Sequence, residues 1–199
     1  MGVSEISSND VGFHMSLLLC FSGQIGSGKS SVSAAVAEAL GWRRTGFGDY
    51  LRGEIARSGG DPDDRQALQD LGQVRVDQDA LNFCRDVLAA GGFQPGDNFV
   101  IDGIRHVSIF EHLSQVSAPS DAKLIFLEAG EVTRSSRVQA RSDAGDFERA
   151  SGHRVEAELR LALPDRADAT IDADNALDRV VADCLGYVRR WTATISARG

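Results

Sequence analysis

The chain has 199 residues, enough for one sizeable hydrophobic core, and its composition is ordinary for a globular protein. A formal net charge of −8 argues against non-specific binding to nucleic-acid backbones, and no apolar run is long enough to span a membrane. We therefore expect neither nucleic acid nor membrane as a partner. Cys20, Cys84 and Cys184 show no metal-binding or disulfide spacing, which favours buried free thiols and a cytoplasmic location.

The N-terminal residues differ in character from the rest of the chain. Residues 1–14 lack the basic start and the apolar core of a signal peptide, and we expect a flexible N-terminal extension there. Residues 15–199 show no linker, internal repeat or low-complexity tract, which predicts a single domain.

The stretch 17–30 combines an apolar run, which predicts a buried strand, with a loop that fits G-x-x-x-x-G-K-[ST]. Glycines let the backbone approach phosphate groups closely, and the helix after the loop directs N–H groups and a positive dipole end at them. Lys29 would reach the β- and γ-phosphates of a nucleoside triphosphate, and the Ser30 hydroxyl would bind Mg²⁺. The candidate nucleotide-binding residues are Gly23, Gly26, Ser27, Gly28, Lys29, Ser30 and Ser31.

Helical patterns dominate the next sixty residues. Apolar residues spaced by four predict a helix over about 29–40 that Gly41 ends, followed by an extended segment over 42–46. The stretch 47–49 begins a further helix, with Asp49 as its N-cap, which runs through Arg57. Residues 63–90 predict a helix in two pieces around Gly72. Its expected inward stripe consists of Leu68, Leu71, Val74, Leu81, Val87 and Leu88. A solvated face explains most polar residues of this helix, but Gln69, Asp70 and Gln73 could line a polar cleft.

The second half alternates strands with helices. The expected strands cover 98–102, 122–128 and 169–172, and the expected helices cover 107–115, 131–141 and the C-terminal segment. Residues 142–152 predict a polar loop, and Val155, Leu159 and Leu163 predict a helix that Pro164 stops. The final helix has the clearest amphipathic stripe: Leu177, Val180, Val181, Cys184, Leu185, Val188 and Trp191.

This alternation, with strands apolar on both faces, predicts a doubly wound parallel α/β sheet. Ligands of such sheets bind beyond the carboxyl ends of the strands. The loop at Gly23, the carboxylate of Asp102 and the turn at Arg105 all come after strand ends, so we expect them at one edge of the sheet.

Charged side chains add two signals. Asp102, at the end of a strand, could hold Mg²⁺ or its waters, although a turn or capping aspartate has the same appearance in a sequence. Arg134, Arg137 and Arg141 share one helix face, as solvated basic residues often do. Phosphoryl transfer needs positive charge on the transferring group, so these arginines are also candidates for that role.

Taken together, these motifs resemble those of the nucleoside monophosphate kinases. The stretches that carry the resemblance are Gly23–Ser30, Phe47–Arg52, Ile101–Arg105 and Arg137–Arg141. In adenylate kinases the last three read T-G-D-x-L-R, D-G-F-P-R and R-x-x-x-R, in the same order. The resemblance implies a five-stranded parallel sheet, a helical acceptor-binding insert over about 49–90 and a short lid over about 141–153. It also implies ATP and Mg²⁺ as ligands and transfer of a phosphoryl group to a monophosphate, giving ADP and a diphosphate.

The same resemblance implies individual roles. Arg52 and Arg105 would bind the acceptor's phosphate, as bidentate donors suited to it. Lys29 and Asp102, the latter by supporting Mg²⁺, would act in catalysis with Arg137 and Arg141, which would clamp the transferring group. Further contacts with the acceptor are expected from Asp49, Gln69 and Gln73.

Other stretches point to particular relatives. Ile104 stands where adenylate kinases have Phe-Pro, and the lid has no four-cysteine zinc site. Residues 67–72 and 153–156 are similar to phage-type deoxynucleoside monophosphate kinases and related P-loop kinases. Residues 167–172 with Asn175 are similar to the adenine-side strand and loop of these proteins and of dephospho-coenzyme A kinases, which makes Asn175 an ATP-binding candidate.

Two alternatives to a monophosphate kinase remain. A hydroxyl acceptor, as in a dephospho-coenzyme A kinase, would require a base, for which Asp49 and Asp102 are the candidates. A nucleotide-binding switch protein on the same fold is an alternative of another class. The absence of a guanine-reading N-K-x-D sequence and the kinase-like arginine spacing argue against the switch.

Overall fold

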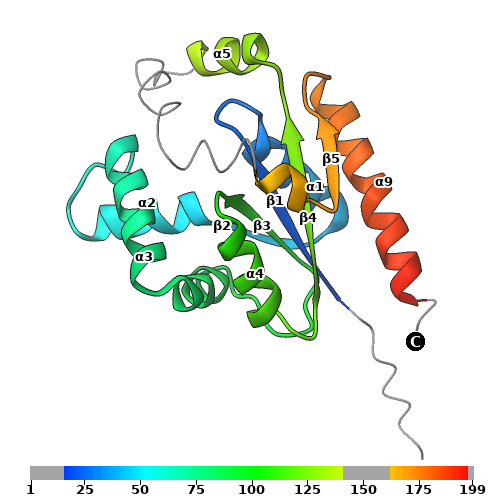
Figure 1. Cartoon of the computed structure of the whole chain (residues 1–199), viewed down its shortest axis with the longest axis horizontal. Coiled ribbons are helices and arrows are strands. Elements are labelled where there is room, and N and C mark those ends of the chain that lie inside the picture. Colours follow the sequence, from blue (N-terminus) through cyan, green and yellow to red (C-terminus); the bar gives the residue numbers. More distant parts are fainter. Residues whose placement is uncertain (1–15, 141–161, 197–199) are drawn as a thin grey trace, which may run out of the picture.

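A computed structural model describes residues 16–140 and 162–196 of the chain. Its strands form one five-stranded sheet in the order β2-β3-β1-β4-β5, and every neighbouring pair of strands is parallel (Figure 1). The elements in chain order are β1 (Leu17–Gly23), α1 (Lys29–Leu40), β2 (Arg43–Gly46), α2 (Phe47–Arg57), α3 (Arg65–Ala90), β3 (Phe99–Ile104), α4 (Val107–Val116), β4 (Asp121–Glu128), α5 (Glu131–Gln139), α8 (Leu163–Arg166), β5 (Ala169–Asp172) and α9 (Leu177–Ser196).

Both faces of the sheet are covered, as the apolar strands predict. Alternate residues of β1 serve opposite faces: Leu18 and Cys20 pack with α2, α3 and α4, whereas Leu17 and Leu19 pack with α1 and α9. Figure 1 shows α2 and α3 on one side of the sheet and α9 on the other. The predicted doubly wound parallel sheet is therefore confirmed. Its central strand β1 leads into the glycine-rich loop at the carboxyl edge.

The three cysteines are free thiols buried in these two layers, as expected. Burial raises the pKa of Cys84 and of Cys184 to about 12, and raises that of Cys20 as well. Within the described ranges, no helix is both long and apolar enough to cross a membrane.

Two details of the helices correct the sequence-based predictions. Asp49 is not an N-cap: α2 begins earlier, its N-cap is Gly46, and Asp49 lies in its first turn. The break in α3 falls at Asp79 rather than at Gly72. The Asp79 carboxylate accepts a hydrogen bond from the Asn82 backbone N–H at 2.9 Å and so caps the second piece of the helix. Gly72 stays helical, and a Cβ there would lie 3.2 Å from the side chain of Leu51 in α2.

Other differences are smaller. Strand β3 continues two residues past Asp102, and α5 ends at Gln139. Val74 and Leu177, expected on inward stripes, are 46% and 48% exposed. Pro164 lies in the first turn of α8, where a missing N–H costs nothing. The extension 1–14, the loop 142–152, the lid 141–153 and the residues Arg141, Val155 and Leu159 lie outside the described residues.

Candidate active site

The glycine-rich loop joins the central strand to α1. Gly26 and Gly28 adopt φ angles of 81° and 85°, in the left-handed region that glycine tolerates best, and Gly28 is the N-cap of α1. Lys29, the first residue of that helix, donates a hydrogen bond to the Gln24 carbonyl at 3.3 Å. Ser27 is buried, and its hydroxyl has no hydrogen-bond partner among the described residues. The loop thus has the glycine conformations and the helix N-terminus that a phosphate site requires.

One cleft of about 230 Å³ opens beside this loop, between α2, α3 and the end of β3. It brings together side chains that are far apart in the sequence. The predicted site residues that line it are Gly26, Lys29, Ser30, Asp49, Arg52, Gln69, Gln73, Asp102 and Arg105. The cleft therefore joins the expected nucleotide loop to all five residues expected to contact an acceptor. Arg65 and His106 also line it, although no motif in the sequence points to them.

Asp102 is the most buried charged group of the cleft, with a side chain only 6% exposed. Its Oδ2 accepts a hydrogen bond from Nη2 of Arg44 at 3.0 Å. Its other oxygen, Oδ1, is buried and has no hydrogen-bond partner within the described part of the chain. Sequence reasoning missed Arg44. The available signal was a charged residue inside a short strand of a sheet covered on both faces, because such a residue needs a partner on a neighbouring strand.

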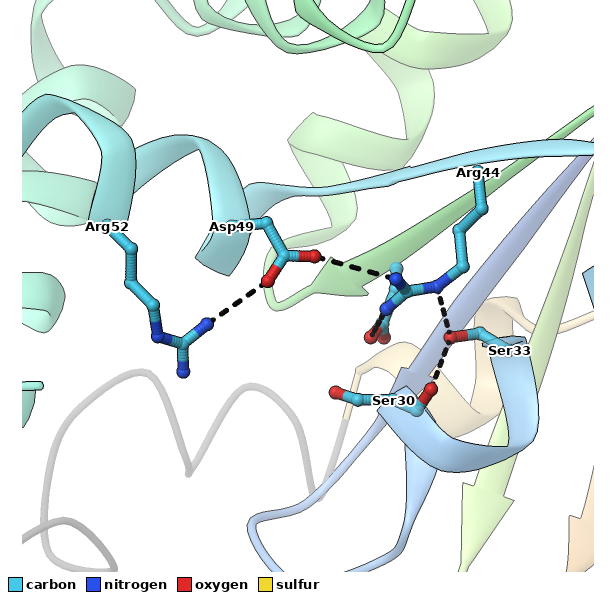
Figure 2. Close-up of polar contacts among 6 residues, drawn as sticks. Ser30, Ser33, Arg44, Asp49 and Arg52 are labelled. Atoms are coloured by element: carbon cyan, nitrogen blue, oxygen red, sulfur yellow. Dashed lines mark hydrogen bonds and ion pairs between the residues drawn. The ribbon is translucent and has the colours of Figure 1, made fainter. Parts of the chain in front are cut away.

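Arg44 joins Asp102 to a longer chain of charges, and Figure 2 shows its part from Arg44 through Asp49 to Arg52. The Arg44 Nη1 also lies 3.5 Å from Oδ2 of Asp49, and the other oxygen of Asp49 accepts a hydrogen bond from Arg52 at 3.2 Å. The four side chains thus alternate in charge from Arg52 to Asp102. Gly46 allows this approach, because a Cβ there would lie only 3.1 Å from Oδ2 of Asp49.

The arginines of α5 also contact the loop. Arg134 donates to the Ile25 carbonyl at 3.5 Å, and Arg137 donates to the Ser27 carbonyl at 3.3 Å. A Cβ on Gly26 would lie 2.6 Å from the Arg134 carbonyl oxygen, so the helix packs directly on the loop. Two of the three predicted arginines are therefore at the nucleotide loop, whereas Arg141 is not described.

Ser31 and Asn175 do not line the cleft. The same holds for four other predicted site residues, namely Gly23, Ser27, Gly28 and Arg137. Ser31 is exposed in the first turn of α1. Asn175 comes after β5 and donates from its amide to Oδ2 of Asp172 at 3.2 Å. The neighbouring Asp174 accepts hydrogen bonds from the Thr133 side chain and from the Gly130 backbone N–H, which lower the pKa of its carboxyl. These bonds tie the turn after β5 to the start of α5.

The oxygen atoms of the cleft fit a Mg²⁺ ion carried by a triphosphate. Asp102 offers a buried carboxylate oxygen without a partner, and the Ser30 hydroxyl lines the same cleft. Mg²⁺ prefers such oxygen ligands and takes the remainder from phosphates and water. Across residues 16–140 and 162–196, no group of three His, Cys, Asp or Glu side chains could hold a metal by protein ligands alone.

Sheet order, glycine-rich loop and cleft together define a P-loop protein with the fold of small-molecule kinases. The chain belongs to the AAA domain family, whose model matches residues 22–150. A UPF0200 protein of Aeropyrum pernix is 33% identical over 106 residues. That match covers 50% of this chain and 52% of the relative, so the chain spans about half the length of the curated relative it matches.

Solved structures share the fold at low sequence identity. A gluconokinase from Sinorhizobium meliloti is 20% identical, with a TM-score of 0.57 over 94% of this chain and 98% of its own. A shikimate kinase from Aquifex aeolicus is 15% identical, with a TM-score of 0.56 over 87% of this chain and 96% of its own. A shikimate kinase from Bacteroides thetaiotaomicron, 14% identical, gives 0.55 over 87% and 98%. At these identities the likeness concerns the fold alone.

Proposed function

We propose that the protein transfers the γ-phosphoryl group of ATP to a nucleoside or deoxynucleoside monophosphate. One observation carries this proposal: the same cleft is lined by Lys29 and Ser30 and also by Arg52 and Arg105. The first pair suits a triphosphate donor, and the second pair suits a phosphate on the acceptor, because guanidinium groups bind phosphate oxygens in a bidentate manner.

The reaction follows from this arrangement. The bond between the γ-phosphorus and the bridging oxygen to the β-phosphate breaks, and a bond from the γ-phosphorus to an acceptor phosphate oxygen forms. ADP and a nucleoside diphosphate leave. The acceptor oxygen is already anionic, so no base is needed, and the protein contributes positioning and neutralisation of charge.

Individual residues have separate tasks in this proposal. Lys29 and the loop N–H groups hold the ATP phosphates, and Arg137 and Arg141 stabilise the transferring group. Mg²⁺, held by Ser30 and Asp102 together with ATP, supplies further neutralisation of phosphate charge. Gln69, Gln73 and Asp49 contact the acceptor, and Asn175 lies on the adenine side of ATP.

A hydroxyl acceptor is the second candidate, and the carboxylate of Asp49 favours it. That side chain is 58% exposed and lines the cleft, so it could accept a proton from a hydroxyl group. The solved structures that share the fold include a gluconokinase and two shikimate kinases, whose names indicate acceptors other than monophosphates.

ADP formation from ATP distinguishes these candidates. The screen covers the common ribo- and deoxyribonucleoside monophosphates together with dephospho-coenzyme A, gluconate and shikimate, with Lys29→Ala as the blank. We expect one monophosphate to raise turnover on the order of a hundredfold or more above that blank, because loss of a transition-state cation costs about that much. Stimulation by a hydroxyl compound alone would replace the first candidate by the second. Slow turnover that no acceptor stimulates would contradict both and favour a switch protein.

A further inference from the structure

The carboxylate of Asp102 is already paired with the guanidinium cation of Arg44. A buried carboxylate is costly unless it is paired, and Arg44 provides the pairing through Nη2, at 3.0 Å from Oδ2. The other oxygen, Oδ1, has no hydrogen-bond partner in the described part of the chain. A metal could therefore reach Oδ1 without displacing the arginine, whereas at Oδ2 the two would compete.

The Arg44 guanidinium is fixed by three side chains from three different elements. Its Nε donates to Ser33 of α1 at 2.9 Å, its Nη2 to Asp102 of β3, and its Nη1 faces Asp49 of α2 at 3.5 Å (Figure 2). Ser33 in turn donates to the backbone carbonyl of Ser30 at 3.2 Å. Arg44 thus connects both residues proposed to hold Mg²⁺, one directly and the other through Ser33.

A cation at Oδ1 of Asp102 would lie close to this guanidinium. Two like charges a few ångströms apart repel each other strongly at the effective dielectric constant of a protein site. A Mg²⁺ ion without nucleotide would be repelled by Arg44, and only the Asp102 carboxylate would attract it there. An ion that arrives with ATP brings the negative charge of the triphosphate, which attracts both the metal and Arg44.

We propose that Arg44 is the resident counter-ion of Asp102 and makes Mg²⁺ binding there conditional on bound ATP. The inference rests on the proposed function, in which Mg²⁺ and ATP share this site. Arg44 is a positioning residue, since it acts through Asp102 and not on the reacting atoms. Asp49 is the second anchor: when Mg²⁺ takes a share of Asp102, Arg44 retains a carboxylate 3.5 Å from its Nη1.

Calorimetric titration separates this role from a purely structural one. The variant is Arg44→Met, and the matched control is Arg43→Met, because Arg43 is 55% exposed and pairs with Asp97 outside the cleft. MgCl₂ is titrated into each protein without nucleotide, and then in the presence of a non-hydrolysable imido analogue of ATP. We expect Arg44→Met to bind Mg²⁺ alone about tenfold or more tightly than the wild type and the control. The gain in Mg²⁺ affinity that the analogue produces should shrink in this variant by a similar factor.

Equal affinity of Arg44→Met, Arg43→Met and wild type for Mg²⁺ alone would overturn the inference. Since loss of one partner of a buried pair destabilises a protein, a second variant covers the case in which Arg44→Met does not fold. Asp49→Asn removes the second carboxylate that faces Arg44. The increase in affinity for the ATP analogue that Mg²⁺ produces should then be several-fold smaller than in the exposed control Asp63→Asn. No change relative to that control would also contradict the inference.

These experiments keep the two proposals apart. If the wild type fails to bind the ATP analogue at all, the proposed function fails. The titrations with Mg²⁺ alone still decide whether Arg44 opposes a metal at Asp102.

Discussion

Arg52 and Arg105 come from different elements, α2 and the turn after β3, yet they line one cleft. Two planar cations in one cleft suit a ligand with several negatively charged oxygens. The proposed function assigns them the acceptor's phosphate and leaves the ATP phosphates to Lys29 and the loop. Loss of one arginine should therefore affect the two substrates unequally.

Arg105→Ala should raise the apparent KM of the acceptor on the order of ten- to hundredfold, because a charge-assisted hydrogen bond contributes about 1.5–3 kcal/mol. The KM for ATP should change less than about threefold. Steady-state kinetics with the acceptor found in the screen measure both values. The control is Arg57→Ala, an exposed arginine of α2 that donates to the Gly53 carbonyl and does not line the cleft. Equal effects on both substrates would contradict the assigned role of Arg105.

The location of the cleft could be predicted from the residue types and their positions in the sequence. The pairing of its charged side chains could not. Asp102, Arg105 and Lys29 lie near ends of parallel strands, and such ends meet at one edge, so their proximity could be predicted. The pairing of Arg44 with Asp102 depends on the register of β2 against β3, in which Gly46 lies opposite Asp102. Pattern alone does not provide that register, because β2 has only four residues and no apolar alternation.

At the scale of elements, helices with strong apolar spacing were predicted well and breaks within helices were not. The bounds of α1 and β5 agree with the expected 29–40 and 169–172, because a glycine cap and a short apolar run mark them. In α3, the break was predicted at Gly72 but falls at Asp79. Gly72 is helical and faces α2, where a Cβ would lie 3.2 Å from Leu51. That contact between helices could not be predicted from local sequence.

The packing of α5 on the glycine-rich loop gives a prediction at this scale. In Gly26→Ala, the new Cβ would lie 2.6 Å from the Arg134 carbonyl oxygen and 2.9 Å from its Cα, at a φ of +81°. Both neighbouring atoms belong to backbone, so α5 or the loop must shift. We expect a loss of stability of about 1–3 kcal/mol and at least tenfold weaker binding of the ATP analogue.

Urea unfolding and calorimetry measure these two effects. Gly53→Ala in α2 is the matched control, since a Cβ there meets nothing within 4 Å. That control should be neutral or more stable by up to about 1 kcal/mol, because alanine favours a helix. If both variants bind the analogue equally well, the contact between α5 and the loop does not hold the loop in place.

At the scale of the whole molecule, the two layers on either side of the sheet each contain a buried thiol. Cys84 of α3 lies in one layer, where its thiol donates to the Ile109 carbonyl at 3.7 Å, and Cys184 of α9 lies in the other. Burial disfavours the thiolate and raises the pKa of both groups to about 12. The core therefore holds protons that the unfolded chain releases at a lower pH.

This difference makes stability depend on pH in a direction that linkage determines. Unfolded cysteines titrate near a pKa of about 8.5, so their contribution to stability is fully present below that pH. Between about pH 9 and 12 the folded protein binds more protons than the unfolded chain. Each thiol should then lower the free energy of unfolding by about 1.4 kcal/mol per pH unit.

Urea unfolding of the wild type and Cys184→Ala, from about pH 7.5 to 10.5, isolates one of these contributions. Other groups that titrate in this range, including Tyr50 with its raised pKa, affect both proteins and cancel in the comparison. We expect the variant to be less stable than the wild type near neutral pH, because it lacks a buried side chain in the layer of α1 and α9. Above about pH 9 its stability should fall less steeply, by about 1.4 kcal/mol per pH unit. Parallel curves over the whole range would contradict this prediction, because they would mean that Cys184 ionises as readily in the folded protein as in the unfolded chain.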